Sequence, residues 1–128
     1  MPKHKHLIIR AEVNHPITSE KKIKQWLRNL VKKIDMKIIK GPYSGYVWKE
    51  GNRGITGVVM IETSHIAIHI WDEVSPALVQ CDVYSCAEFS SNEVLAEFVS
   101  MGITKIDHLM LDREDTIKPI GKIGKWYN

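Results

Sequence analysis

The sequence predicts an α+β fold, a two-layer sandwich in which two helices pack on one face of an antiparallel sheet. Two observations favour this class. Only two stretches show the apolar spacing of a surface helix, whereas five or six show the alternation or the β-branched composition of strands. They occur in the order strand, helix, three or four strands, helix, strand. At 128 residues the chain fits one domain with a core of its own, so we expect a single domain over 1–128.

The first strand and helix lie in the N-terminal third of the chain. Residues 5–13 are rich in Ile and Val and precede a turn-prone Asn-His-Pro, which predicts a strand. The helix that follows has Thr18 or Ser19 available as its N-cap. Its apolar residues form one stripe at positions Ile23, Trp26, Leu27, Leu30, Val31 and Ile34. The lysines between them are expected to form a solvated face.

Three strands are expected in the middle of the chain. They are 36–48 with an interruption at Gly41-Pro42, 54–61, and 65–71. Because strand side chains have a period of two, three isoleucines of the last strand share one face. The opposite face carries His65, Ala67, His69 and Trp71. One face is therefore suited to a core and the other is not.

The last predicted elements are a strand, a helix and another strand. In the strand over 78–86, Cys81 lies on the apolar side and Cys86 on the opposite side. Ser90 and Glu93 form a possible capping box at the start of the helix, which stops at Gly102. Its inward residues are expected to be Val94, Leu95, Phe98 and Val99. A strand over 103–111 follows, and the tail, 113–128, is either disordered or covers a neighbouring subunit.

Charge and hydropathy exclude several classes of protein. The net charge of +3 is modest, and the basic residues lack the aromatic interleaving of single-strand binders, so no nucleic-acid partner is expected. No segment approaches the roughly 20 apolar residues of a membrane span. The apolar run near the N-terminus is too short for a signal peptide, and two cysteines are too few for a disulfide framework. These features predict a cytoplasmic protein.

The residues suggest two kinds of site, a metal site and a hydrolase site. His65 and His69 lie about 13 Å apart on a strand, too far to share an ion, so no metal site is expected. A hydrolase would use Ser64, His69 and Cys86, although no nucleophile elbow surrounds the serine. These three residues converge on one site if their strands lie side by side.

Two segments resemble the prokaryotic S-adenosylmethionine decarboxylases, which are self-processing proenzymes. They are 57–73, GVVMIETSHIAIHIWDE, and 82–86, DVYSC. The shared features are a Ser-His-Ile segment ending in a second His, a Trp-x-Glu, and a Cys that closes the following strand. A weaker fit of the flanking elements extends over about residues 4–112.

The resemblance implies a role for each matching residue. Ser64 attacks the carbonyl of Thr63, the amide becomes an ester, and elimination leaves a covalent pyruvoyl group on the new N-terminus. Self-cleavage is thus expected between Thr63 and Ser64. His69 helps to remove the α-proton, and Thr56 takes the place of a hydroxyl residue that aids processing. Cys86 protonates the substrate carbon after carbon dioxide leaves.

The implied chemistry is physically reasonable. Decarboxylation of an α-amino acid builds a carbanion, and a pyruvoyl carbonyl supplies the electron sink that pyridoxal phosphate supplies elsewhere. A thiol is a sensible proton donor, because thiols stay mostly protonated near neutral pH. By resemblance, Trp71 stacks on adenine and Glu73 accepts from the ribose hydroxyls, with Trp48 as a possible second aromatic wall. The expected substrate is S-adenosylmethionine, in spermidine biosynthesis, and the expected assembly is a homodimer of processed subunits.

The sequence departs from the family pattern in four places. Thr63 stands where the family usually has Glu, Asp72 replaces a Pro, and Ala87 replaces a Gly. The loop between Glu73 and Cys86 is also about two residues longer. Two alternatives therefore stay open, a pyruvoyl-dependent ornithine or arginine decarboxylase and a relative that never cleaves and serves as a binding or regulatory subunit.

Overall fold

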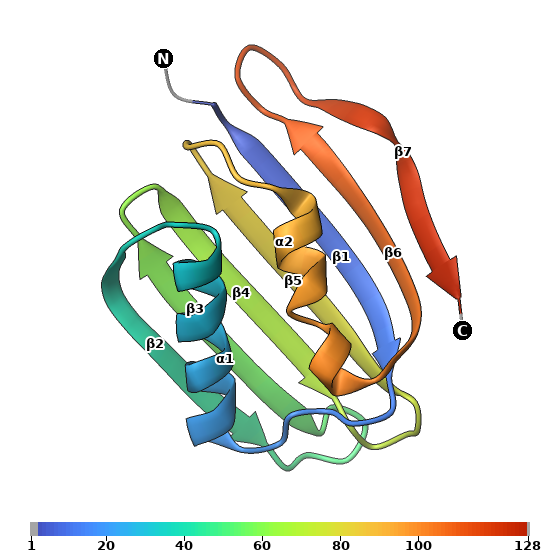
Figure 1. The fold of residues 1–128 in the computed structure, drawn as a ribbon. Helices are drawn as coiled ribbons and strands as arrows, with labels where there is room; N and C mark the ends of the chain where they lie inside the picture. Colours follow the sequence, from blue (N-terminus) through green and yellow to red (C-terminus); the bar gives the residue numbers. More distant parts are fainter. Residues whose placement is uncertain (1–2, 128) are drawn as a thin grey trace.

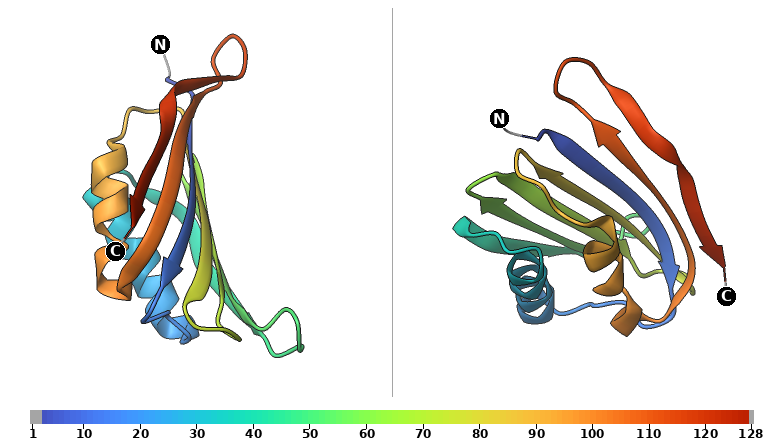
Figure 2. Two further views of the ribbon diagram at one scale, coloured as in Figure 1. Left: turned by 90° about the vertical axis from the view of Figure 1, so that its right-hand side faces the viewer. Right: turned by 45° about the horizontal axis from the view of Figure 1, so that its top comes forward.

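A computed structural model describes residues 3–127, and its main feature is a seven-stranded antiparallel sheet with the order β2-β3-β4-β5-β1-β6-β7 (Figure 1). Both α-helices lie on the same face of this sheet (Figure 2). The elements are β1 Lys5–Val13, α1 Glu20–Lys33, β2 Ile38–Val47, β3 Gly54–Ile61, β4 Ser64–Trp71, β5 Ala77–Ser85, α2 Ser91–Ala96, the 3-10 turn η1 Val99–Met101, β6 Ile103–Asp112 and β7 Lys118–Tyr127. The predicted α+β sandwich is confirmed.

The core lies between the helices and the sheet. The apolar stripe of α1 is buried as predicted, and Ser19 caps the helix by accepting a hydrogen bond from the Lys22 N–H at 3.3 Å. The Trp26 indole packs edge-on against Phe98 and donates to the Glu97 carbonyl at 2.8 Å. This contact joins α1 to the end of α2. Each Leu or Ile removed from water here stabilises the fold by about 1.5–3 kcal/mol.

The other face of the sheet carries no helix of the described chain, and we call it the open face (Figure 2). The strict alternation of β4 places Ile66, Ile68 and Ile70 in the core. His65 and His69 consequently belong to the open face. Several apolar side chains on this face are solvent-exposed, including Ile8, Tyr43, Val47, Val58 and Met60. The histidines and the tryptophan singled out in the sequence therefore lie outside the core.

The C-terminal tail and the second helix differ from expectation. Residues 118–127 form β7, an edge strand antiparallel to β6, which the sequence did not predict because its side chains are almost all exposed and show no core-facing alternation. The second helix ends already at Ala96. The prediction that Val99 points inward is wrong, because this side chain is 68% exposed and Met101 takes the buried place. The capping box is also absent, since the Ser90 side chain makes no capping bond.

Neither helix in the described part of the chain is long and apolar enough to cross a membrane.

Candidate functional site

The peptide between Thr63 and Ser64 lies in the tight turn that joins β3 to β4. Ile61 and Ser64 pair across the hairpin, so Glu62 and Thr63 form a two-residue connection. The Glu62 N–H donates to the Lys37 carbonyl at 2.9 Å, which fastens the turn to the segment before β2. Ser64 has a φ of 146°, in a region that favours glycine. Such a conformation costs on the order of 1–3 kcal/mol, so the backbone at this peptide is strained.

Cys86 meets this turn through its backbone. Ser64 pairs with Ser85 at the end of β5, and the next residue, Cys86, donates its N–H to the Thr63 carbonyl at 2.8 Å. Its thiol is free and partly buried. The structure thus gathers Thr63, Ser64 and Cys86 at one end of the sheet, which we call the cleavage end.

Cys81 occupies a different environment from Cys86. It is buried in the core, as predicted. Burial, helped by the neighbouring Asp82 charge, raises the pKa of the Cys81 thiol well above its ordinary value. An inaccessible thiol that resists ionisation has no part in proton transfer, which leaves Cys86 as the candidate acid.

A second cluster lies at the other end of β4. Thr56 and His69 are register partners, and the Thr56 hydroxyl lies 3.0 Å from His69 Nδ1. The His69 ring stacks on Trp71 with 5.9 Å between centroids, and the Trp71 indole donates to Asn52 Oδ1 at 2.9 Å. Thr56, His69 and Trp71 line one cavity of about 240 Å³, which we call the histidine end.

The two ends are separated along β4. His69 lies five positions after Ser64, a distance of about 16 Å at about 3.3 Å per residue. A single chain therefore brings Ser64 together with Cys86 and brings His69 together with Thr56 and Trp71. It does not bring Ser64 next to His69.

Glu73 and Asp72 fasten the histidine end to the turn between β2 and β3. Glu73 Oε1 accepts from the N–H groups of Gly51 at 2.7 Å and Arg53 at 3.0 Å. Asp72, the residue in place of the family's proline, accepts from Arg53 Nε at 2.9 Å and from the Tyr46 hydroxyl at 2.6 Å. The hydrogen bond to Asp72 is the main reason that the pKa of Tyr46 is raised. The Asp72 carboxylate thus links the end of β4 to β2 through Tyr46 and to the turn before β3 through Arg53.

Trp48 lies apart from this cavity in the described chain. Its side chain is 79% exposed, and its ring packs on Tyr46 at 4.5 Å between centroids. Its assignment as a second aromatic wall stays a prediction. Sequence reasoning missed Asn52, Arg53 and Tyr46, because nothing local to these residues indicates that the turn folds against residues 71–73. The substitution of Asp72 for Pro was the available signal.

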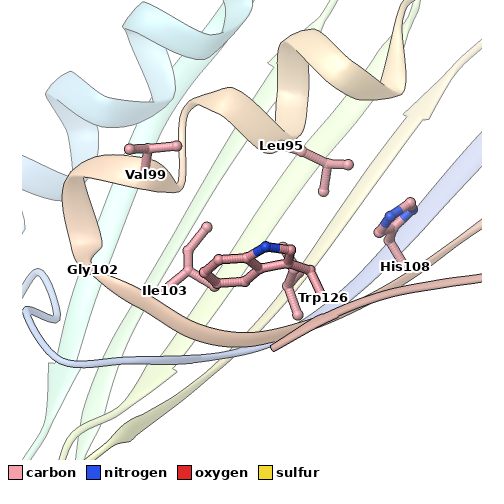
Figure 3. Close-up of a pocket in the computed structure, with 7 residues that line it drawn as sticks. Leu95, Val99, Gly102, Ile103, His108 and Trp126 are labelled. Carbon is pink, nitrogen blue, oxygen red and sulfur yellow. The ribbon is translucent and has the colours of Figure 1, made fainter. Parts of the chain in front are cut away.

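An apolar pocket of about 500 Å³ lies on the helix-covered side, where α2 and η1 approach β6 and β7 (Figure 3). Leu95, Ile103, His108 and Trp126 point into it. His108 lies against Gly124, where an added Cβ would come within 2.2 Å of the imidazole. The pocket contains none of the predicted site residues.

Comparisons with known proteins agree on one family. The family model described as S-adenosylmethionine decarboxylase matches residues 5–114. The S-adenosylmethionine decarboxylase proenzyme of Hydrogenobaculum sp. is 31% identical over 112 residues, which are 86% of this chain and 79% of that protein. The proenzyme of Archaeoglobus fulgidus is 32% identical over 78 residues, 60% of this chain and 63% of that protein.

The fold has a match among solved structures as well. The crystal structure of the adenosylmethionine decarboxylase from Aquifex aeolicus superposes with a TM-score of 0.71 at 24% identity, covering 94% of this chain and 98% of that chain. At this identity the likeness concerns the fold. Because the family model spans most of the sequence, including the turn at Ser64, both clusters and Cys86, this chain belongs to the S-adenosylmethionine decarboxylase family.

Proposed function

We propose that this chain is a proenzyme that cleaves itself before Ser64, acquires a pyruvoyl group there, and decarboxylates S-adenosylmethionine for spermidine biosynthesis. One observation carries the proposal. The carbonyl of Thr63 already accepts a hydrogen bond from a fixed backbone donor, the Cys86 N–H, and the next residue is a serine in a strained conformation. A carbonyl held in this way beside a hydroxyl nucleophile is prepared for acyl transfer.

Cleavage proceeds in two stages. Ser64 Oγ bonds to the Thr63 carbonyl carbon, its proton passes to the amide nitrogen, and the C–N bond breaks, leaving an ester. The Cys86 N–H stabilises the negative charge that develops on the Thr63 oxygen. Loss of the Ser64 α-proton then expels the Thr63 carboxylate, and one water hydrolyses the remaining dehydroalanine to the pyruvoyl group with release of ammonia. Backbone strain at Ser64 favours the first stage, because breaking the amide bond before Ser64 releases that strain.

The residues of the mature site fit this group. The pyruvoyl carbonyl supplies the electron sink for decarboxylation. Cys86 lies at the same end of the sheet and brings a thiol proton to the carbon from which carbon dioxide departs. At the histidine end, which the homodimer described below places near the partner subunit's Ser64, Trp71 offers its ring to adenine. Glu73 uses one carboxylate oxygen on Gly51 and Arg53, which leaves its other oxygen for a ribose hydroxyl.

A homodimer completes the site. In one chain the cleavage end and the histidine end lie at opposite ends of β4, so His69 cannot reach the Ser64 α-proton. Two copies related by a two-fold axis, with their open faces together and their β4 strands antiparallel, place each Ser64 near the partner subunit's His69. The exposed apolar side chains of the open face, among them Ile8 and Met60, suit such an interface. The cytoplasmic location stays a prediction.

Mass spectrometry of the purified protein tests the proposal. We expect fragments 1–63 and 64–128, the second beginning with a pyruvoyl group. A folded protein that shows only the full-length mass after long incubation contradicts self-cleavage and favours the non-cleaving alternative. Offered S-adenosylmethionine, ornithine and arginine separately, the cleaved protein should release carbon dioxide from the first. Release from either of the other two alone would favour the alternative substrate class.

Co-expression of two variants tests the dimer. A Ser64→Ala chain lacks the nucleophile and a His69→Ala chain lacks the base, so neither is expected to complete cleavage alone. In mixed dimers the His69→Ala chain should be cleaved, because the partner subunit's His69 serves its Ser64. Failure of cleavage in purified mixed dimers would contradict the shared site.

A further inference from the structure

Ser85 is the only polar or charged residue that is buried among residues 3–127. It ends β5, pairs with Ser64 across the sheet, and directly precedes Cys86. A hydroxyl removed from water is costly unless it is hydrogen-bonded, so its partners show why it is placed there. One of those partners is Thr63, the residue whose carbonyl belongs to the peptide at which cleavage is proposed.

The Ser85 hydroxyl is the middle member of a chain of hydrogen bonds. The Ala87 N–H donates to Ser85 Oγ at 3.0 Å, and the Ser85 hydroxyl donates to Thr63 Oγ1 at 2.9 Å. The Thr63 hydroxyl in turn donates to the Met36 sulfur at 3.2 Å. The Ser85 hydroxyl also lies 3.6 Å from the same sulfur, so both hydroxyls are within reach of Met36, and the contact between the two hydroxyls is the shortest of the three. Thr63 is therefore held through its side chain as well as through its carbonyl.

These contacts surround the donor that faces the scissile carbonyl. Ser85 and Ala87 flank Cys86, whose N–H donates to the Thr63 carbonyl at 2.8 Å. The Ser85 hydroxyl thus binds both the segment that carries the donor and the residue that carries the acceptor. A threonine in place of the family's usual glutamate supplies the hydroxyl that receives this bond.

We infer that Ser85 is a positioning residue for self-cleavage, whose hydroxyl keeps the Thr63 carbonyl on the Cys86 N–H while Ser64 Oγ bonds to the carbonyl carbon and the C–N bond breaks. The inference rests on the proposed function. It concerns only the first stage, because Thr63 becomes the C-terminus of the other fragment once the ester has eliminated.

The size of the effect follows from what Ser85→Ala leaves in place. The Cys86 N–H remains, so the loss should be smaller than the roughly 10²–10³-fold cost of deleting an oxyanion donor. A displaced reacting group alone costs up to about 10²-fold. We expect cleavage to slow about tenfold to a hundredfold, within these limits. The kcat of enzyme that has finished cleaving should change by less than about threefold, since no reacting group was removed.

The test follows the fraction of uncut chain over time after cell-free synthesis of the full-length protein. The variants are Ser85→Ala, Thr63→Val, the double variant, and Ser85→Thr, which keeps the hydroxyl. Cys81→Ala is the matched control, because it truncates a buried side chain on the same side of β5 away from the turn. A parallel series with hydroxylamine, which cuts esters, reports ester formation apart from elimination. Unfolding temperatures measured in the Ser64→Ala background report stability alone.

We expect Ser85→Ala and Thr63→Val to slow cleavage to a similar extent. The double variant should cleave no more slowly than the slower single variant, because both replacements break the same hydrogen bond. Ser85→Thr should cleave faster than Ser85→Ala. Hydroxylamine should not restore the rate, because the ester itself forms slowly. Wild-type cleavage kinetics in Ser85→Ala would overturn the inference, as would equal slowing by Cys81→Ala. If Ser85→Ala does not fold, the cleavage rate of Thr63→Val tests the inference by itself, and a wild-type rate in that variant would overturn it. A wild-type chain that never cleaves would refute the proposed function, and the inference with it.

Discussion

The replacement Cys86→Ala should separate the two reactions proposed for this protein. In the structure the residue contributes two groups with different tasks. Its backbone N–H faces the Thr63 carbonyl at 2.8 Å, and its thiol is the candidate proton donor. Alanine keeps the first group and removes the second, so cleavage should continue while decarboxylation fails.

The magnitudes follow from these tasks. A positioned general acid is worth about 10²–10⁴ in rate, so kcat for decarboxylation should fall by about that factor, or about 3–5 kcal/mol in activation free energy. The cleavage rate should stay within about threefold of wild type, because the oxyanion donor is unchanged. Cleavage is measured by intact mass over time, and decarboxylation by release of labelled carbon dioxide from fully cleaved protein.

Cys81→Ala is the control for this experiment. It should lower the free energy of unfolding by about 1–2 kcal/mol through lost core packing and leave kcat unchanged. The reasoning would be refuted if Cys86→Ala blocked cleavage, or if Cys81→Ala reduced decarboxylation and Cys86→Ala did not. Either outcome would mean that the assignment of the acid, and the strand register behind it, is wrong.

Three further predictions concern the thiols and the substrate. In the folded protein iodoacetamide should modify only Cys86, because burial keeps the Cys81 thiol protonated and inaccessible. In urea it should modify both cysteines. Modification of both thiols in the folded protein would contradict the burial of Cys81. Trp71→Leu removes a stacking contribution of about 1–3 kcal/mol, so kcat/KM of the cleaved enzyme for S-adenosylmethionine should fall about tenfold or more. An unchanged kcat/KM would show that no adenine stacks there. Glu73→Gln should raise KM without preventing cleavage, and a variant that binds as tightly as wild type would exclude the carboxylate from ribose binding.

The alternation of apolar and polar residues in β4 and the apolar stripe of α1 with its 3.6-residue period were enough to predict both layers of the fold. Each pattern identifies the side chains that are buried in the core. The edge strand β7 has no such constraint. Its residues are held by backbone pairing with β6 and pack little, so their identities carry little information about structure. The second helix was predicted, but its end was not. Gly102 ends the 3-10 turn η1 and not α2, and the change to 3-10 geometry exposes Val99.

The sequence named candidate residues for the site, and their roles stay predictions, but it did not predict how they are arranged. Resemblance and spacing singled out Ser64, His69 and Cys86, and they suggested convergence on one site. Within one chain Ser64 and His69 cannot converge, because they lie five positions apart on the same strand, a distance of about 16 Å. Ser85 went unnoticed because a serine beside a cysteine at a strand end carries no sequence signal. The role proposed for it rests on its hydrogen bonds to Thr63 and Ala87.

The strand order has a consequence for the two fragments that the proposed cleavage before Ser64 would produce. The N-terminal fragment holds β1, β2 and β3, and the C-terminal fragment holds β4 to β7. In the sheet they interleave, because β1 of the first fragment lies between β5 and β6 of the second, while β3 pairs with β4. A nicked molecule is therefore two interlocked polypeptides that cannot part without dismantling the middle of the sheet. Refolding of such a nicked molecule would be bimolecular, whereas the uncut chain can assemble the same sheet alone. If the chain cleaves as proposed, folding should therefore precede cleavage.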